Sequence, residues 1–297
     1  MAREAASATA GRTNNTLRLR DGRQLGYAEF GDPNGKPLFF LHGFPNSRLG
    51  PAFAHEDARR RGIRVIAIER PGFGRSDFKR GRTIGDWPND VVEAADVLGI
   101  ERFAVLGASG GGPYAAACAA KIPHRLTATG IVSGLGPLDV PASAAGFRRW
   151  DRFVLSLARR FPLLIWMVMS FVALGIRLFP RLLIWLMSRS LPAPDKAILA
   201  RPEIKASVRD DIREAFRQGA RAAVYEAQLY LRPWDFRPEE ISIDVQLWHG
   251  EADATVPVSM GRYMAQAIPN CRATFYPGEG HLMAVDRMDE IHTALLR

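Results

Sequence analysis

The sequence predicts an α/β protein built on a mostly parallel, eight-stranded sheet with helices on both faces. Short apolar runs recur along its 297 residues, bounded by glycine or polar residues and separated by helical stretches. Continuous apolar runs of this kind are typical of strands that are buried on both faces of a parallel sheet. The hydrophobic content of 47% is sufficient for a sizeable core.

The first two predicted strands form a hairpin. Residues 16–20 and 24–29 flank Asp21-Gly22, a pair that favours a tight turn. Residues 1–14 are small and polar and lack the apolar segment of a secretory signal, so we expect a disordered leader and a cytoplasmic protein. The six other strands are expected at 37–41, 64–68, 103–106, 128–132, 245–248 and 273–276, with a helix at 84–98.

A glycine-rich segment at residues 107–111 follows the fifth strand and precedes an alanine-rich helical stretch. A strand that turns sharply into a helix there would hold Ser109 above the sheet edge in a strained conformation, and the small neighbours would permit the close crossing. The Gly110 N–H would then lie at the helix N-terminus, where amide donors are free. Pro113 suits the first helical turn. The segment therefore predicts a serine nucleophile.

Two further candidates follow the last two predicted strands. Asp253 lies in the loop after the seventh strand, and His281 in the loop after the eighth. Functional groups of a parallel sheet gather at the carboxyl ends of its strands. A serine hydroxyl needs an imidazole to accept its proton, so His281 is assigned as general base and then general acid. Asp253 would orient His281 and stabilise its charged form.

Five motifs resemble the α/β-hydrolase superfamily, in the same order, over nearly the whole chain after residue 15. They are His42-Gly43-Phe44-Pro45, residues 70–77, the serine segment, the loop from Gly250 to Pro257, and Gly280-His281. The order serine, aspartate, histidine is that of the family's catalytic triad. The resemblance implies the α/β-hydrolase fold with an inserted α-helical cap. Some relatives carry the acid one strand earlier, which makes Asp139 the alternative to Asp253.

An acyl-transfer enzyme also needs two donors for the negatively charged oxygen of its intermediate. Gly110 N–H is one candidate, and Phe44 N–H is the expected second, because Pro45 has no N–H. His42 is expected to shape this loop by hydrogen bonding, and His249 to have a packing role. No cluster has metal-ligand spacing and no nucleotide-binding fingerprint is present, so neither a metal nor another cofactor is expected.

The predicted domains are a hydrolase core at 15–135 and 242–297 and a helical cap at 136–241. Pro162 and Pro180 are placed to begin two short helices of the cap. No individual substrate-binding residue is assigned within the cap.

The first half of the cap is both apolar and basic. Residues 161–176 carry no charge, yet they are too few to span a membrane. Eight arginines and one acid, Asp151, lie between Ser143 and Arg189. The cap is therefore expected either to pack on the core around an apolar pocket or also to dock on a lipid surface. The net charge of +9 includes only five lysines, and the arginine excess is interpreted mainly as a compositional preference, so nucleic acid is not an expected partner.

These features predict a serine hydrolase, carboxylesterase-like, that cleaves apolar esters through an acyl-enzyme intermediate. The same triad also serves thioester, amide or C–C bond hydrolysis and cofactor-free perhydrolysis. The alternative of another class is a non-catalytic ligand-binding protein on the same fold. A monomer is the default expectation.

Overall fold

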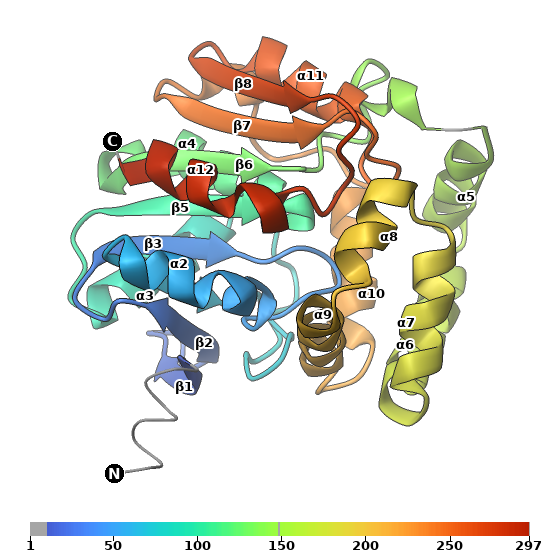
Figure 1. The fold of residues 1–297 in the computed structure, drawn as a ribbon, viewed down its shortest axis with the longest axis horizontal. Coiled ribbons are helices and arrows are strands. Elements are labelled where there is room, and N and C mark those ends of the chain that lie inside the picture. Colours follow the sequence, from blue (N-terminus) through green and yellow to red (C-terminus); the bar gives the residue numbers. More distant parts are fainter. Residues whose placement is uncertain (1–10, 148, 297) are drawn as a thin grey trace.

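The computed structural model describes residues 11–147 and 149–296, and it has the predicted sheet of eight strands (Figure 1). The strands are β1 (Arg12–Arg18), β2 (Gln24–Gly31), β3 (Lys36–Leu41), β4 (Ile63–Ile68), β5 (Phe103–Ala108), β6 (Leu126–Val132), β7 (Val245–Gly250) and β8 (Cys271–Tyr276). They pair in the order β1-β2-β4-β3-β5-β6-β7-β8. Strand β2 is antiparallel to β1 and β4, and every other pair is parallel.

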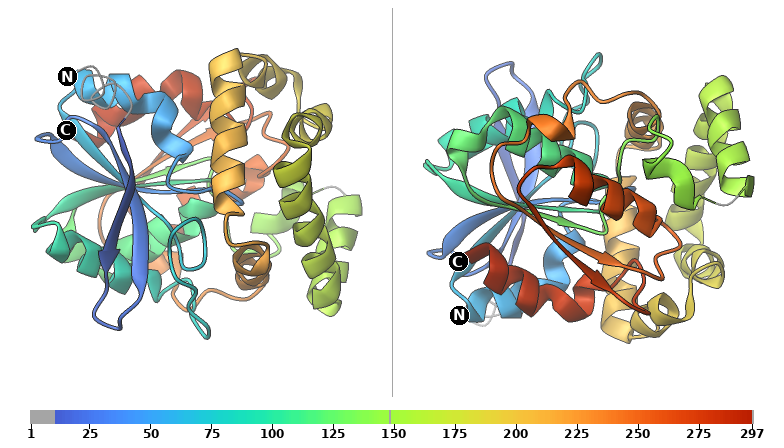
Figure 2. Two further views of the ribbon diagram at one scale, coloured as in Figure 1. Left: turned by 90° about the horizontal axis from the view of Figure 1, so that it is seen from below. Right: turned by 90° about the horizontal axis from the view of Figure 1, so that it is seen from above.

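Helices pack on both faces of this twisted sheet (Figure 2). The helices of the core are α2 (His55–Arg60), α3 (Trp87–Val97), α4 (Gly112–Lys121), α11 (Val258–Ala267) and α12 (Ala284–Leu296). Helices α3, α4 and α11 bury their apolar sides in one cluster that includes Val105 and Ile131 of the sheet. Helices α2 and α12 contribute to a second cluster on the opposite face, with Val65 and Leu106. The fold class predicted from the apolar runs is therefore confirmed.

The chain between β6 and β7 lies beyond the carboxyl ends of the strands (Figure 1). Its helices are α5 (Arg149–Arg160), α6 (Pro162–Leu178), α7 (Pro180–Arg189), α8 (Ala193–Leu199), α9 (Pro202–Ala215) and α10 (Arg221–Tyr230). They fall within the range 136–241 expected for a cap, and Pro162 and Pro180 begin α6 and α7 as predicted. Over residues 11–147 and 149–296, no helix has the length and apolar character needed to cross a membrane.

Two boundaries differ from the predictions by more than two residues. Strand β1 begins at Arg12, so the end of the expected leader is part of the sheet, while residues 1–10 lie outside the described residues. The first residues of this strand were not predicted because they are polar and lie at the edge of the sheet, where Arg48 donates to the Thr13 carbonyl at 2.6 Å. Helix α3 begins at Trp87 and not at residue 84, because the Asp86 carboxylate accepts the Thr83 N–H in a turn, at 2.8 Å.

Candidate active site

Ser109 occupies a sharp turn between strand β5 and helix α4. Its φ of 53° lies in the left-handed region, which is strained for a residue with a Cβ. The glycines on either side permit the crossing of strand and helix. A Cβ on Gly107 would lie 2.7 Å from the Ala115 Cβ, and one on Gly111 would lie 2.0 Å from the Leu41 carbonyl oxygen. No other residue fits these two positions without displacing the backbone.

The structure brings Ser109, His281 and Asp253 together at the carboxyl ends of their strands. The distance from Ser109 Oγ to His281 Nε2 is 3.0 Å, and from His281 Nδ1 to Asp253 Oδ2 it is 2.7 Å. With Nδ1–H donating to the carboxylate, Nε2 is left to accept the serine proton. The other carboxylate oxygen of Asp253 accepts the N–H groups of Thr255 and Val256, each at 2.8 Å. The carboxylate is thereby held in one orientation.

Among the described residues, neither Asp139 nor His249, the two other candidates for this region, forms a hydrogen bond with Ser109. Asp139, the alternative acid, is exposed on the loop after β6, and Asp253 occupies the place beside the imidazole. His249 is fully buried and donates from Nε2 to the Val256 carbonyl at 2.9 Å. Its Nε2 also lies 3.5 Å from Asp253 Oδ2. His249 thus has the predicted packing role and in addition borders the Asp253 carboxylate.

Charges in the site determine the protonation states of Asp253 and His281. Burial raises the pKa of Asp253, but the charge and hydrogen bonds of His281 and His249 outweigh it, and the net pKa is below its ordinary value. Burial lowers the pKa of His281, whereas the Asp253 carboxylate and, to a smaller extent, Asp195 raise it, with a net increase above 6.5. Asp253 is therefore ionised at neutral pH, and the pKa of His281 is raised above its ordinary value.

We expect kcat/KM to fall as the pH decreases through the raised pKa of His281. Only the neutral imidazole accepts the serine proton, so the acidic limb of the profile should lie above the ordinary histidine value of 6.5. Asp253 should produce no limb above pH 4, because its pKa is lowered. The measurement is a pH–rate profile of kcat/KM on a neutral ester. A limb below pH 6 would contradict the charge arrangement described here.

Two backbone amides flank the serine as candidate oxyanion donors. Gly110 is in the first turn of the helical segment that follows Ser109, where an N–H has no partner within the helix. A Cβ on Gly110 would lie 2.9 Å from the Phe44 Cβ, so the two residues are in contact. Within the described part of the chain, the Phe44 N–H donates to no protein acceptor. Both predicted donors therefore lie next to Ser109.

The loop before Phe44 is held by His42 and Arg70. His42 is fully buried and its Nε2 accepts the Arg70 N–H at 3.2 Å, in line with the shaping role predicted for it. The Arg70 guanidinium donates to the His42 carbonyl and, at 2.7 Å, to the Gly43 carbonyl. These contacts orient the peptide that precedes the Phe44 amide.

A buried acid on helix α10 of the cap connects to the segments that carry the Phe44 and Gly110 amides. It was not predicted from the sequence. Glu226 has no exposed surface; its Oε1 is 2.6 Å from Arg70 Nε, and its Oε2 accepts from Arg82. The Tyr230 hydroxyl lies 2.9 Å from Glu226 Oε1 and 2.8 Å from the Gly110 carbonyl oxygen. Burial raises the pKa of Glu226, but the two arginines lower it to about 2. The acid is therefore ionised.

A second acid of the cap, Asp195 on helix α8, holds the loop that carries His281. Its carboxylate is fully buried and accepts the His281 N–H at 3.0 Å and the Leu282 N–H at 2.8 Å. A Cβ on Gly280 would lie 2.4 Å from Asp195 Oδ1, which explains the glycine before the histidine. No local signal in the sequence distinguishes Asp195 from an exposed helical acid.

Asp195→Asn is expected to act through His281. The amide retains one acceptor oxygen, so one of the two backbone N–H groups is left unpaired, at a cost of about 1–3 kcal/mol in unfolding free energy. Loss of the negative charge should also lower the pKa of His281 and move the acidic limb of kcat/KM to lower pH. The pH–rate profile is the readout that a purely structural role would leave unchanged. Asp210→Asn, which removes an exposed acid of the same cap, is the matched control.

Two cavities lie near the serine. The first, of about 170 Å³, contains Ser109 and His281 and extends between Phe40, Phe53 and Val208. Its polar corner is Asp211, which accepts hydrogen bonds from Ser47 and Asn46. The second, of about 340 Å³, has an almost entirely apolar lining under helices α5 and α6, and Phe44 and Tyr230 form part of its wall. A substrate at Ser109 would therefore meet mainly apolar side chains.

The fold and this site are those of an α/β-fold hydrolase. The model of the alpha/beta hydrolase fold family matches residues 36–287, and the chain belongs to this family.

Similar proteins include hydrolases with different substrates. The chain is 26% identical over 290 residues to a bifunctional esterase/perhydrolase of Acinetobacter calcoaceticus. The matched region covers 93% of this chain and 96% of that protein. It is 30% identical over 116 residues to a proline iminopeptidase of Neisseria gonorrhoeae, but this covers only 37% of the chain and 36% of the peptidase. The structure of a thermophilic esterase from Thermogutta terrifontis, 21% identical, superposes with a TM-score of 0.67 over 95% of this chain and 97% of the esterase. That likeness shows the shared fold.

Proposed function

We propose that this hydrolase is a carboxylesterase that cleaves small esters with an apolar portion. The observation that carries the proposal is the continuous relay of 3.0 Å from Ser109 to His281 and 2.7 Å from His281 to Asp253. The similarity to an esterase/perhydrolase along nearly the whole chain supports ester chemistry. A ligand-binding protein has no need for a strained serine beside a charge-paired imidazole.

In the proposed reaction, Ser109 Oγ attacks the ester carbonyl carbon while its proton passes to His281 Nε2. The carbonyl oxygen becomes negatively charged and accepts hydrogen bonds from the Gly110 and Phe44 N–H groups, each typically worth about 3 kcal/mol of the barrier. The C–O bond then breaks, and the alcohol leaves with the proton from His281. Water, deprotonated by His281, attacks the acyl-enzyme and releases the carboxylic acid and the free serine. Asp253 stabilises the imidazolium in both steps.

We expect the enzyme to hydrolyse p-nitrophenyl esters, with short acyl chains preferred over palmitate. The cavity that contains Ser109 holds about 170 Å³, below the roughly 300–1,000 Å³ of sites for drug-sized ligands. The measurement is kcat/KM across a series from acetate to palmitate. A folded protein without turnover on any member would contradict the carboxylesterase proposal, and an optimum at palmitate would contradict the assignment of the small cavity.

Perhydrolysis is a second candidate, favoured by the similarity to the bifunctional esterase/perhydrolase of Acinetobacter calcoaceticus. Here hydrogen peroxide replaces water in the attack on the acyl-enzyme and gives a peracid in place of the acid. Because both reactions share the acyl-enzyme, they are distinguished by the product. Peracid formed from an ester and peroxide, at a rate above that of the Ser109→Ala variant, would establish the activity.

A further inference from the structure

The outer side of the cap exposes a large apolar surface on helices α6 and α7. We define the outer cap face by Trp166, Phe171, Leu174, Leu178, Leu182 and Trp185, which are 48–68% exposed. In α6, whose seventeen residues are largely apolar, only Ile165 and Ile176 are buried. Figure 1 shows α6 and α7 side by side at the edge of the molecule farthest from the sheet. Contiguous exposed apolar surfaces of this kind mark interaction sites.

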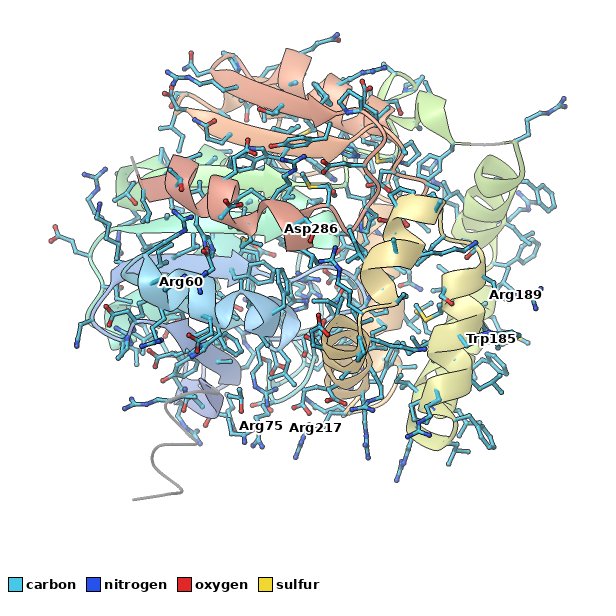
Figure 3. The ribbon with its side chains drawn as sticks, viewed as in Figure 1. Arg60, Arg75, Trp185, Arg189, Arg217 and Asp286 are labelled. Atoms are coloured by element: carbon cyan, nitrogen blue, oxygen red, sulfur yellow. The ribbon has the colours of Figure 1, made fainter. Side chains whose placement is uncertain are left out.

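The exposed apolar residues form one stripe along each helix. In α6, residues 163, 167, 171, 174 and 178 are exposed and recur at the helical spacing of three or four. In α7, Arg181, Trp185 and Arg189 follow one another at intervals of four, so arginines and an apolar ring share one side. Arg189 lies 5.1 Å from the Trp185 ring centre, and Figure 3 shows both on the side of α7 away from the sheet.

The charges on this face are of one sign and are not neutralised. Residues 161–189 contain Arg177, Arg181 and Arg189 and no acid. Among the residues that the structure describes, none forms an ion pair with these three arginines, and all three are exposed. A groove of about 650 Å³ between α6 and α9 borders this face, but Asp210 and Glu214 line it together with Arg213 and Arg217, and Arg217 lies 3.5 Å from Glu214. The unpaired charge of the face is therefore that of the three arginines of α6 and α7. Apolar side chains among unpaired arginines are complementary to the interface of an anionic membrane.

A second copy of the chain fits this face poorly. In a two-fold symmetric dimer, the same patch contacts itself. The arginines of one copy would then oppose those of the other in a desolvated contact, with no acid on either outer cap face to pair with them. An anionic lipid surface instead supplies phosphate oxygens to the arginines and an acyl region to the tryptophans and phenylalanine.

We propose that the outer cap face docks in the headgroup region of anionic membranes. The helices would lie along the surface, because neither is long enough to cross it. The apolar cavity lies under α5 and α6, with Ile165 and Met169 of α6 in its wall, so docking would place the cap between the lipid and the candidate active site. The inference does not rest on the proposed esterase activity, because docking is a property of the surface alone.

The test is cosedimentation with two kinds of vesicle, one of phosphatidylcholine and one also containing phosphatidylglycerol. We expect binding to the anionic vesicles at low ionic strength, with less binding as salt is added. A triple variant should lower the partition coefficient for the anionic vesicles on the order of 100-fold, since each basic residue near such a surface contributes about a factor of five. This variant combines Arg177→Gln, Arg181→Gln and Arg189→Gln. Trp166→Ala with Trp185→Ala should weaken binding to both kinds of vesicle.

The matched control combines Arg18→Gln, Arg60→Gln and Arg272→Gln, which removes the same charge from exposed positions outside the cap. This control should bind nearly as wild type does, and circular dichroism should show each variant folded. Absence of binding to anionic vesicles at low salt would overturn the proposal, as would equal losses in the cap and control variants. Concentration-dependent dimers in the analytical ultracentrifuge, disrupted by the tryptophan substitutions, would assign the face to a second copy instead. None of these readouts requires ester turnover.

Discussion

Ser109→Ala is expected to lower kcat for ester hydrolysis by about 10⁶-fold, the order found when a triad nucleophile is removed. Without Oγ no acyl-enzyme forms, and His281 has no proton to accept from the enzyme. The oxyanion donors and the cavity remain, so a residual rate above that in water should persist. The measurement is kcat on the fastest p-nitrophenyl ester, together with mass-spectrometric detection of a phosphonate adduct on wild type and its absence in Ser109→Ala.

Two other serine variants make the test specific. Ser242→Ala removes an exposed hydroxyl far from the site and should leave kcat unchanged. Ser133→Ala removes another serine that lines the cavity and that, like Ser109, has a positive φ, of 46°. Loss of the adduct in Ser133→Ala, with retention in Ser109→Ala, would assign the nucleophile to Ser133. Because alanine also has a Cβ, Ser109→Ala retains the strain of its φ of 53°, and Tm should change little.

The core of the fold could be predicted because its strands are buried on both faces. Residues 37–41 and 103–106 are continuous apolar runs, and the structure has β3 at Lys36–Leu41 and β5 at Phe103–Ala108. Burial on two faces leaves no place for polar residues, so composition alone identifies such strands. The first residues of β1 were not predicted because an edge strand tolerates polar residues, and there its pairing with β2 is interrupted by a bulge between Arg12 and Asn15.

The site divides in a similar way. Ser109, Asp253 and His281 each follow a predicted strand of a parallel sheet. Because the carboxyl ends of such strands share one edge of the sheet, the sequence order was enough to place the three residues together. Asp195 and Glu226 lie on amphipathic cap helices, where an acid is usually solvated. Their roles come from partners distant in sequence: Asp195 accepts from His281, 86 positions away, and Glu226 accepts from Arg82, 144 positions away. Only the tertiary packing of the cap on the core creates these contacts.

Glu226→Gln is expected to lower the free energy of unfolding by about 3–5 kcal/mol, because it leaves buried arginines without their counterion. The side chains of Arg70 and Arg82 are only 1% and 3% exposed, so water cannot replace the lost charge. Arg70 also orients the His42 and Gly43 carbonyls before Phe44, so kcat should fall as well. Urea denaturation at neutral pH, compared with wild type, measures the stability change.

The matched control is Glu251→Gln, whose partner Arg262 is 55% exposed, so the expected change is below about 1 kcal/mol. Acid should reproduce part of the Glu226 effect in the wild type. The pKa of Glu226 is lowered from 4.5 to about 2, so its contribution to stability is complete above pH 4.5 and is lost as the pH falls toward 2. In Glu226→Gln this part of the acid dependence should be absent. Equal losses of stability in the two glutamine variants would contradict the prediction. They would show that the buried ion pairs of Glu226 contribute no more to the free energy of unfolding than an exposed pair does, and that the cap is held on the core by its apolar contacts.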